Sequence, residues 1–110
     1  MKLSKSPRPL APNAGCVAGC LKVLGNKWTA LILRNLLSGP KRFGELEKSL
    51  EHISPRTLSQ RLDDLEENGI VTKQSFAEVP PRTEYSLTKK GKDLLPVLQQ
   101  MADWGTKYSD

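Results

Sequence analysis

The chain has few of the residues that usually build catalytic or metal sites. Its 110 residues include one histidine, two cysteines and two each of tryptophan, tyrosine and phenylalanine. The histidine, His52, is accompanied by no Gly-x-Ser-x-Gly motif, phosphate-binding loop or paired carboxylates, so we expect no enzyme and no catalytic residue. Cys16, Cys20 and His52 match no zinc-ligand spacing, so we expect no metal and no cofactor.

Long hydrophobic runs are also missing. No apolar stretch approaches the roughly 18 residues of a membrane-spanning helix. The basic opening MKLSKSPRPLAP lacks the apolar segment of a signal peptide. We therefore expect a cytoplasmic, soluble protein with no membrane partner, with its cysteines present as reduced thiols. The length allows a single domain.

The net charge of +5 is unevenly distributed. Residues 1–53 carry nine cations and three anions, whereas residues 54–110 carry eight cations and nine anions. Residues 1–13 hold three cations, three prolines and no acid, which predicts a flexible basic arm before a domain at residues 14–110. The arm is interpreted either as a contact to nucleic acid or as an ordinary chain terminus. Attraction to a polyanion therefore depends on the face that each charge occupies.

Apolar residues at helical spacing predict four helices in the first two thirds of the chain. They cover residues 16–24, 28–37, 43–50 and 54–68. Gly25 with Asn26 ends the first helix, and Gly39 with Pro40 ends the second. Ser54 before Pro55 is an N-cap signal for the fourth helix, which Asn68 and Gly69 end. The third and fourth helices are thus joined by a tight connection.

The pattern then changes to short strands. Residues 70–75 and 82–87 are rich in Ile, Val, Thr and Tyr and predict a β-hairpin with a proline-containing tip. Thr88 is expected to cap one last helix, kinked at Pro96. The fold class is therefore mainly α with a small β-hairpin (α+β), in the order of a winged helix-turn-helix, with the fourth helix placed for a DNA major groove.

The fourth helix presents a polar face opposite its leucines. Arg56, Ser59, Gln60 and Asp63 recur at i, i+3, i+4 and i+7, with Thr57 and Arg61 on the flank. Guanidinium, amide and hydroxyl groups are the ones that recognise base edges and phosphates. Acids crowd the C-terminal half of the helix, so we expect its N-terminal half to enter the groove. The alternative is that Arg56 and Arg61 only pair with those acids.

The predicted hairpin adds two cations, Lys73 and Arg82. They are candidates for contacts to the phosphate backbone or the minor groove. The alternative is that they pair with Glu84 and Glu78 on the hairpin itself, an arrangement that contributes little free energy.

The motifs GNKW, ISPRTLSQRL and PPRTEYSLT follow one another in this order within residues 16–105. On these motifs the chain resembles the HxlR-type transcriptional regulators, a winged-helix branch related to the MarR group. The resemblance implies a homodimeric, sequence-specific regulator that binds double-stranded DNA through the helix after Ser54 and the hairpin wing. The expected DNA contacts are Ser54, Arg56, Thr57, Ser59, Gln60, Arg61, Lys73 and Arg82. The first and last helices are implied to form the dimer, through Val17, Cys20, Leu21, Leu94, Leu98, Met101, Gly105 and Tyr108.

The cysteines depart from the pattern of that family. Many members carry a cysteine followed by proline at the entrance to the first helix, and some use it to sense oxidants or electrophiles. Here Cys16 is followed by Val17. A helix N-terminus favours the thiolate, so Cys16 is the candidate thiol sensor, whereas Cys20 lies on the apolar stripe.

The functional hypothesis is a homodimeric regulator on a pseudo-palindromic operator, with a redox, electrophile or small-molecule effector left open. The alternative is a winged-helix protein-interaction module without specific DNA binding, since helix-turn-helix folds also serve that role.

Overall fold

The first two helices meet at a tight corner. In the computed structural model, which describes residues 15–109 and the side chains of residues 17–109, α1 spans Gly15–Leu24 and α2 spans Lys27–Asn35. Asn26 is the N-cap of α2, because its side-chain oxygen accepts a hydrogen bond from the Trp28 N–H at 2.8 Å. A short 3₁₀ turn, η1 (Leu36–Ser38), completes the second predicted helix.

A helix-turn-helix follows. It consists of α3 (Phe43–Ser49) and α4 (Pro55–Glu67). The turn between them includes His52, whose φ of 74° places it in the left-handed region. Ser54 caps the N-terminus of α4, as the sequence predicts. Gly69, also at φ 74°, lies in the turn that follows the C-terminus of α4.

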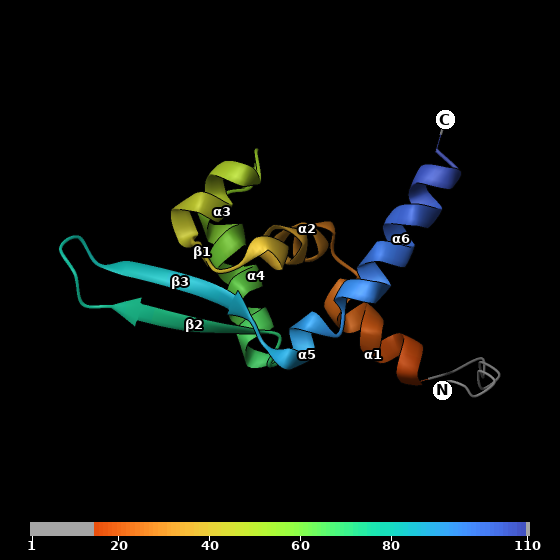
Figure 1. The fold of residues 1–110 in the computed structure, drawn as a ribbon, viewed down its shortest axis with the longest axis horizontal. Coiled ribbons are helices and arrows are strands. Elements are labelled where there is room, and N and C mark those ends of the chain that lie inside the picture. Colours follow the sequence, from red (N-terminus) through yellow and green to blue (C-terminus); the bar gives the residue numbers. More distant parts are fainter. Residues whose placement is uncertain (1–14, 110) are drawn as a thin grey trace.

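The wing is a long antiparallel hairpin that extends away from the helices (Figure 1). It is formed by β2 (Val71–Phe76) and β3 (Arg82–Leu87), in a register that pairs Val71 with Leu87 and Phe76 with Arg82. A third strand, β1 (Lys41–Arg42), pairs with β3 and completes a sheet of order β1-β3-β2. The sequence analysis missed β1, because two residues are too few to show an alternating pattern.

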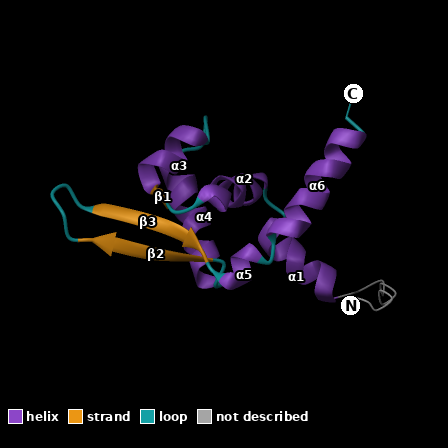
Figure 2. Cartoon of the chain, viewed as in Figure 1, coloured by secondary structure: helices purple, strands orange, loops and turns teal. Residues whose placement is uncertain are grey.

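The single kinked C-terminal helix was a wrong expectation. The chain instead forms α5 (Lys89–Lys92), capped by Thr88, and then a separate α6 (Leu95–Lys107) that projects away from the body toward the C-terminus (Figure 2). Pro96 lies in the first turn of α6. Proline has no N–H to donate and crowds a preceding helical turn, so the first turn of a new helix accommodates it without strain.

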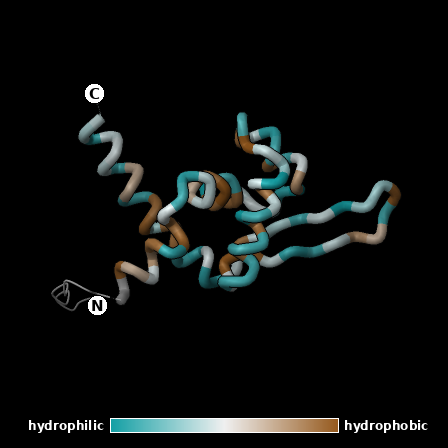
Figure 3. The backbone as a smooth tube through the Cα atoms, turned by 180° about the vertical axis from the view of Figure 1, so that it is seen from behind, coloured by the Kyte–Doolittle hydropathy of each residue, from teal (hydrophilic) through white to brown (hydrophobic). Residues whose placement is uncertain are grey.

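The core lies where α2, α3, α4 and the base of the wing meet. Its hydrophobic members are Leu24, Ile32, Leu33, Leu36, Leu46, Leu50, Ile53, Leu58, Leu62, Leu65, Ile70, Val71 and Tyr85. Figure 3 shows hydrophobic residues at this junction and hydrophilic ones along most of the wing. The leucines of α4 therefore face inward and leave its polar side outward.

The predicted basic arm at residues 1–13 lies outside the described residues, so it stays a prediction. Within residues 15–109, no helix is long and apolar enough to cross a membrane. The observed class, mainly helical with a small antiparallel sheet, is the one that the sequence predicts.

Candidate nucleic-acid interface

The outward face of α4 carries the predicted base-contacting side chains. Leu58, Leu62 and Leu65 are buried on the opposite side of the helix. Arg56, Ser59, Gln60 and Asp63 are all exposed and lie at helical spacing on one face. Arg56 makes no ion pair with any residue that the structure describes, so its guanidinium fork is available to a ligand.

Two of the predicted DNA-contacting residues, Ser54 and Thr57, form hydrogen bonds at the N-terminus of α4. The Thr57 N–H donates to Ser54 Oγ at 3.0 Å, and the Ser54 hydroxyl donates to Thr57 Oγ1 at 2.9 Å. Thr57 is half-buried, whereas Ser54 is exposed. These hydroxyls therefore fix the N-terminus of α4, and its first backbone N–H groups are placed at the exposed end of the helix.

Arg61 is less accessible than its neighbours on α4. Its side chain is 26% exposed and lies 3.3 Å from Asp64. Its Nε is buried and has no hydrogen-bond partner among the described residues. Arg61 thus forms the ion pair with an acid of its own helix that the sequence analysis considered as an alternative. Arg56 forms no such pair with the described residues.

The acids of α4 lie toward the wing end of the helix. Burial, followed by the nearby carboxylates of Asp63 and Glu66, raises the pKa of Tyr85 on β3 above its ordinary value. Burial and negative charge both disfavour the phenolate, so the two carboxylates act in the same direction as the burial of the ring. The N-terminal half of α4, residues 55–61, contains no acid.

The two wing cations differ in their surroundings. Lys73 is exposed on β2, opposite Tyr85 in the strand register, and forms no ion pair within residues 17–109. Arg82 lies 3.1 Å from Glu78 and 3.5 Å from Glu84, and its guanidinium carbon lies 4.0 Å from the centroid of the Phe76 ring. The alternative pairing considered for the hairpin is therefore present at Arg82.

The predicted dimer residues divide into two groups. Val17, Leu21, Met101 and Tyr108 are exposed, as is Gly105. Cys20, Leu94 and Leu98 are instead partly buried and pack against the core of their own chain. The residues predicted on the C-terminal segment thus lie on two different faces: Leu94 and Leu98 face the core, whereas Met101 and Tyr108 are exposed.

The outward face of α6 includes two hydrophobic residues that the sequence analysis missed, Val97 and Trp104. Trp104 is 68% exposed, and its ring centroid lies 5.2 Å from that of Tyr108 one turn later. Val97, Met101, Trp104 and Tyr108 fall at i, i+4, i+7 and i+11, which is a helical period counted from Val97. Starting the stripe at Val97 instead of Leu94 would have found them.

Hydrogen bonds connect the residues that follow α4 to Thr88 and α5. Lys90 Nζ donates to the Asn68 carbonyl at 2.7 Å, and the Thr88 hydroxyl donates to the Gly69 carbonyl at 2.5 Å. The Thr88 N–H donates to the Ile70 carbonyl at 3.0 Å. The carbonyl groups of Asn68, Gly69 and Ile70, which directly follow α4, are thereby bonded by the segment that leads into α6.

Cys16 lies in the first turn of α1, but its side chain is outside the described part of the chain. Its role as a thiol sensor stays a prediction. His52 occupies the exposed turn before α4.

Comparison with known proteins identifies the family to which the chain is similar. A model described as HxlR-like helix-turn-helix matches residues 23–110. The chain is 42% identical over 97 residues to the HTH-type transcriptional regulator YdeP of Bacillus subtilis (strain 168), covering 87% of this chain and 76% of the relative. It is 46% identical over 88 residues to YvaP of the same organism, also an HTH-type transcriptional regulator, covering 80% and 82% of the two chains.

Solved structures of similar proteins share the fold. The redox regulator HypR in its oxidised form matches with a TM-score of 0.80 and 38% identity, over 86% of this chain and 98% of that one. The reduced form of the transcriptional regulator YodB from B. subtilis matches with a TM-score of 0.77 and 35% identity, over 93% and 97%. With the family model matching most of its length, the chain belongs to the HxlR-like helix-turn-helix family of transcriptional regulators.

Proposed function

We propose that this protein is a homodimer that binds a pseudo-palindromic operator through the N-terminal half of α4. The observation that carries the proposal is the exposed face of α4, where Arg56, Ser59 and Gln60 lie opposite three buried leucines. An exposed guanidinium and amide on a helix-turn-helix are suited to guanine and adenine edges in the major groove.

Each polar residue has a distinct role in the proposal. Arg56 and Gln60 contact bases, while Ser54, Thr57 and Ser59 contact phosphates or base edges. Arg61, Lys73 and Arg82 contact the backbone or the minor groove. The surroundings favour Lys73 over Arg61 and Arg82, because the latter two are partly buried and paired with carboxylates.

The dimer is proposed to form through α1 and α6. Leu21 is 59% exposed on α1, and the outward face of α6 carries Met101, Trp104 and Tyr108. A groove of about 750 Å³ between α2 and α6, lined by residues such as Leu37, Leu95 and Met101, adjoins this face. Large exposed apolar side chains of this kind are typical of protein–protein interfaces. Two-fold symmetry then requires half-sites about 34–36 Å apart, or a multiple of that distance.

A redox or electrophile signal is proposed to act at Cys16. The support is the similarity to HypR, named a redox regulator and solved in oxidised and reduced forms, and to YodB, also solved after diamide treatment. Mass spectrometry after mild peroxide treatment should find Cys16 modified together with an altered DNA affinity. An unchanged response in Cys16→Ser removes the sensor from the proposal.

The proposal places the protein in the cytoplasm, where it acts on DNA without catalysing a reaction. Selection of bound fragments from a random DNA pool across a salt series tests it. A recovered symmetric motif and a steep negative slope of log affinity against log salt are expected. Failure to enrich any sequence at low salt would favour a protein-interaction module instead.

A further inference from the structure

The turn that joins α3 to α4 holds a non-glycine residue in the left-handed region of backbone conformation. The Ile53 N–H donates to the Leu50 carbonyl at 3.1 Å, which closes a β-turn over residues 50–53. His52 occupies the third position of this turn, with a φ of 74°. Leu50 and Ile53 are buried on either side of it. The core therefore fixes the path of the backbone through the turn, whichever residue stands at position 52.

Histidine is a costly residue at this position. Turns that need a positive φ at their third residue usually carry glycine or asparagine there, because glycine has no Cβ to clash with the backbone. Strain of this kind persists mainly where the side chain serves a function. His52 is the single histidine of the chain. Its place at a strained position before the recognition helix indicates a role for the imidazole.

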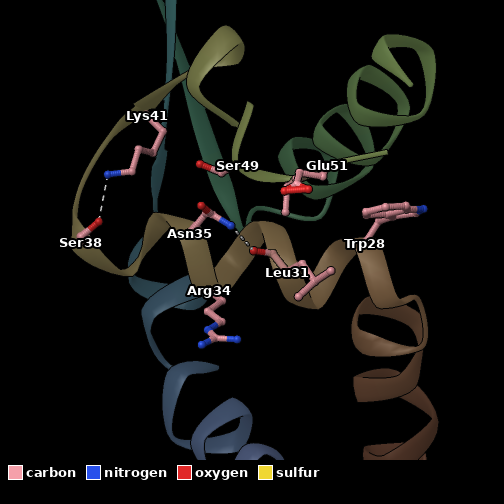
Figure 4. A pocket seen from close by; sticks show the side chains of 9 residues that line it. Trp28, Leu31, Arg34, Asn35, Ser38, Lys41, Ser49 and Glu51 are labelled. Atoms are coloured by element: carbon pink, nitrogen blue, oxygen red, sulfur yellow. Dashed lines mark hydrogen bonds between the residues drawn. The ribbon is translucent and has the colours of Figure 1, made fainter. Parts of the chain in front are cut away.

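The two central residues of the turn have different surroundings. Glu51 lines a cavity of about 480 Å³ along α2, and Figure 4 shows it there with Ser49, Trp28 and Leu31. His52 does not line this cavity. Its side chain is exposed and forms no ion pair within residues 17–109. The imidazole is therefore accessible to a molecule outside the chain.

The turn lies at the end of α4 that we propose to contact DNA. His52 precedes the N-cap Ser54 by two residues, so their Cα atoms are at most about 7 Å apart. In helix-turn-helix proteins the first helix crosses the phosphate backbone, and the N-terminal residues of the second helix contact base edges. The turn between the two helices consequently lies beside a phosphate when α4 enters the groove.

Cations outnumber carboxylates on the elements around the turn. The charged side chains are Lys27 and Arg34 of α2, Glu47 and Lys48 of α3, Glu51 of the turn itself, and Arg56 and Arg61 of α4. Of these, only Arg61 forms an ion pair with a residue that the structure describes. A phosphate at the turn would therefore be attracted by its surroundings.

We propose that His52 donates a hydrogen bond to a DNA phosphate when α4 occupies the major groove, a contact that rests on the proposed function. A protonated imidazole carries an N–H on each nitrogen and a positive charge, so it forms a charge-assisted bond to a phosphate oxygen. A neutral imidazole donates one uncharged bond. Histidine side chains ordinarily gain their charge between about pH 8 and pH 5. The contact is therefore stronger at lower pH.

Binding isotherms of the full-length protein at pH 6 and pH 8 test this contact, with the selected site and with random DNA. His52→Asn keeps a residue that tolerates a positive φ but removes the cation. At pH 6 this variant should bind both DNAs several-fold more weakly than the wild type, because a phosphate contact does not depend on sequence. At pH 8 the difference should shrink.

Three further variants separate the contact from other effects. His52→Lys carries its charge at both pH values and should bind at pH 8 about as tightly as the wild type does at pH 6. Glu51→Gln removes a carboxylate from the same turn and should keep the wild-type pH response. His52→Gly relieves the strain, so it should weaken binding at pH 6 without lowering the melting temperature of the free protein.

Two results would overturn the contact while the wild type binds its site specifically. One is the same affinity at pH 6 in His52→Asn and the wild type. The other is a loss confined to the selected site, which would make His52 a base contact. Absence of specific binding by the wild type at both pH values would instead refute the proposed function, and the phosphate contact with it.

Discussion

The Arg82 guanidinium carbon lies 4.0 Å from the centroid of the Phe76 ring, its direct partner across the wing hairpin. The same side chain contacts the carboxylates of Glu78 and Glu84 and is only 23% exposed. Arg82 therefore helps to hold the two strands together near the tip of the wing. Its planar fork is what allows stacking and two ion pairs at once.

This geometry predicts that charge alone does not preserve the function of Arg82. Arg82→Lys keeps the cation but loses the stacking and the forked contacts, so DNA affinity should fall several-fold. The measurement is a binding isotherm at two salt concentrations. Lys73→Arg, a charge-conserving change at an exposed position, is the control and should have little effect. Equal affinities of Arg82→Lys and the wild type would show that the stacking and the ion pairs of Arg82 do not contribute to DNA binding.

Arg56 is predicted to contribute to sequence selectivity. Arg56→Ala should cost about 1–3 kcal/mol on the selected site and less on random DNA, because a bidentate base contact is lost. Competition binding with both DNAs measures the difference. Lys22→Ala, which removes an exposed cation on α1, should not change the ratio. Equal weakening on both DNAs would reduce Arg56 to a phosphate contact.

Ser54 caps α4 at the end of the helix that we propose to contact DNA. Ser54→Ala leaves the Thr57 N–H without its cap and should lower the free energy of unfolding by about 0.5–2 kcal/mol in urea titrations. Ser54→Asp keeps an N-cap acceptor and should retain stability, but its negative charge should weaken DNA binding. A stable Ser54→Asp variant with unchanged DNA affinity would place this end of α4 away from the phosphates.

Gly91 is predicted to be required for the corner between the wing and α5. A Cβ built at Gly91 would collide with the Ile70 carbonyl oxygen and lie 3.1 Å from Leu87. Gly91→Ala should therefore reduce the free energy of unfolding by about 1–3 kcal/mol. Gly44→Ala, on α3 with open space around it, should be neutral or stabilising by up to about 1 kcal/mol. Similar urea midpoints for the two variants would contradict the close contact.

Trp104 is predicted to stabilise the dimer but not the monomer fold. Trp104→Ala removes a largely exposed ring from α6, so sedimentation should show weaker dimerisation with far-UV circular dichroism unchanged. Leu98→Ala provides the contrast, since Leu98 packs against the core and its loss should lower thermal stability. A dimerisation constant unaffected by Trp104→Ala would exclude this face from the interface.

The recognition helix was predictable from local signals. Ser54, Pro55, Asn68 and Gly69 mark both ends of α4, and the leucine spacing between them determines which face is polar. The exposure of Arg56, Ser59 and Gln60 therefore followed from the sequence. Strand β1 and the break before α6 did not, because β1 exists only through its pairing with β3 and Pro96 is compatible with a kink or a new helix.

Tertiary contacts determine the surroundings of Arg82. Only the pairing of the two strands places it against Phe76, Glu78 and Glu84.

The C-terminal segment has apolar residues on two faces. Packing against the rest of the chain turns Leu94 and Leu98 inward and leaves Met101, Trp104 and Tyr108 outside. The sequence by itself determined the helix-turn-helix, its wing and the polar face of α4, since these depend on residues close together in the chain. Which cations of the described residues are unpaired and which apolar face of α6 is exposed depended on contacts between distant segments, which local patterns do not encode.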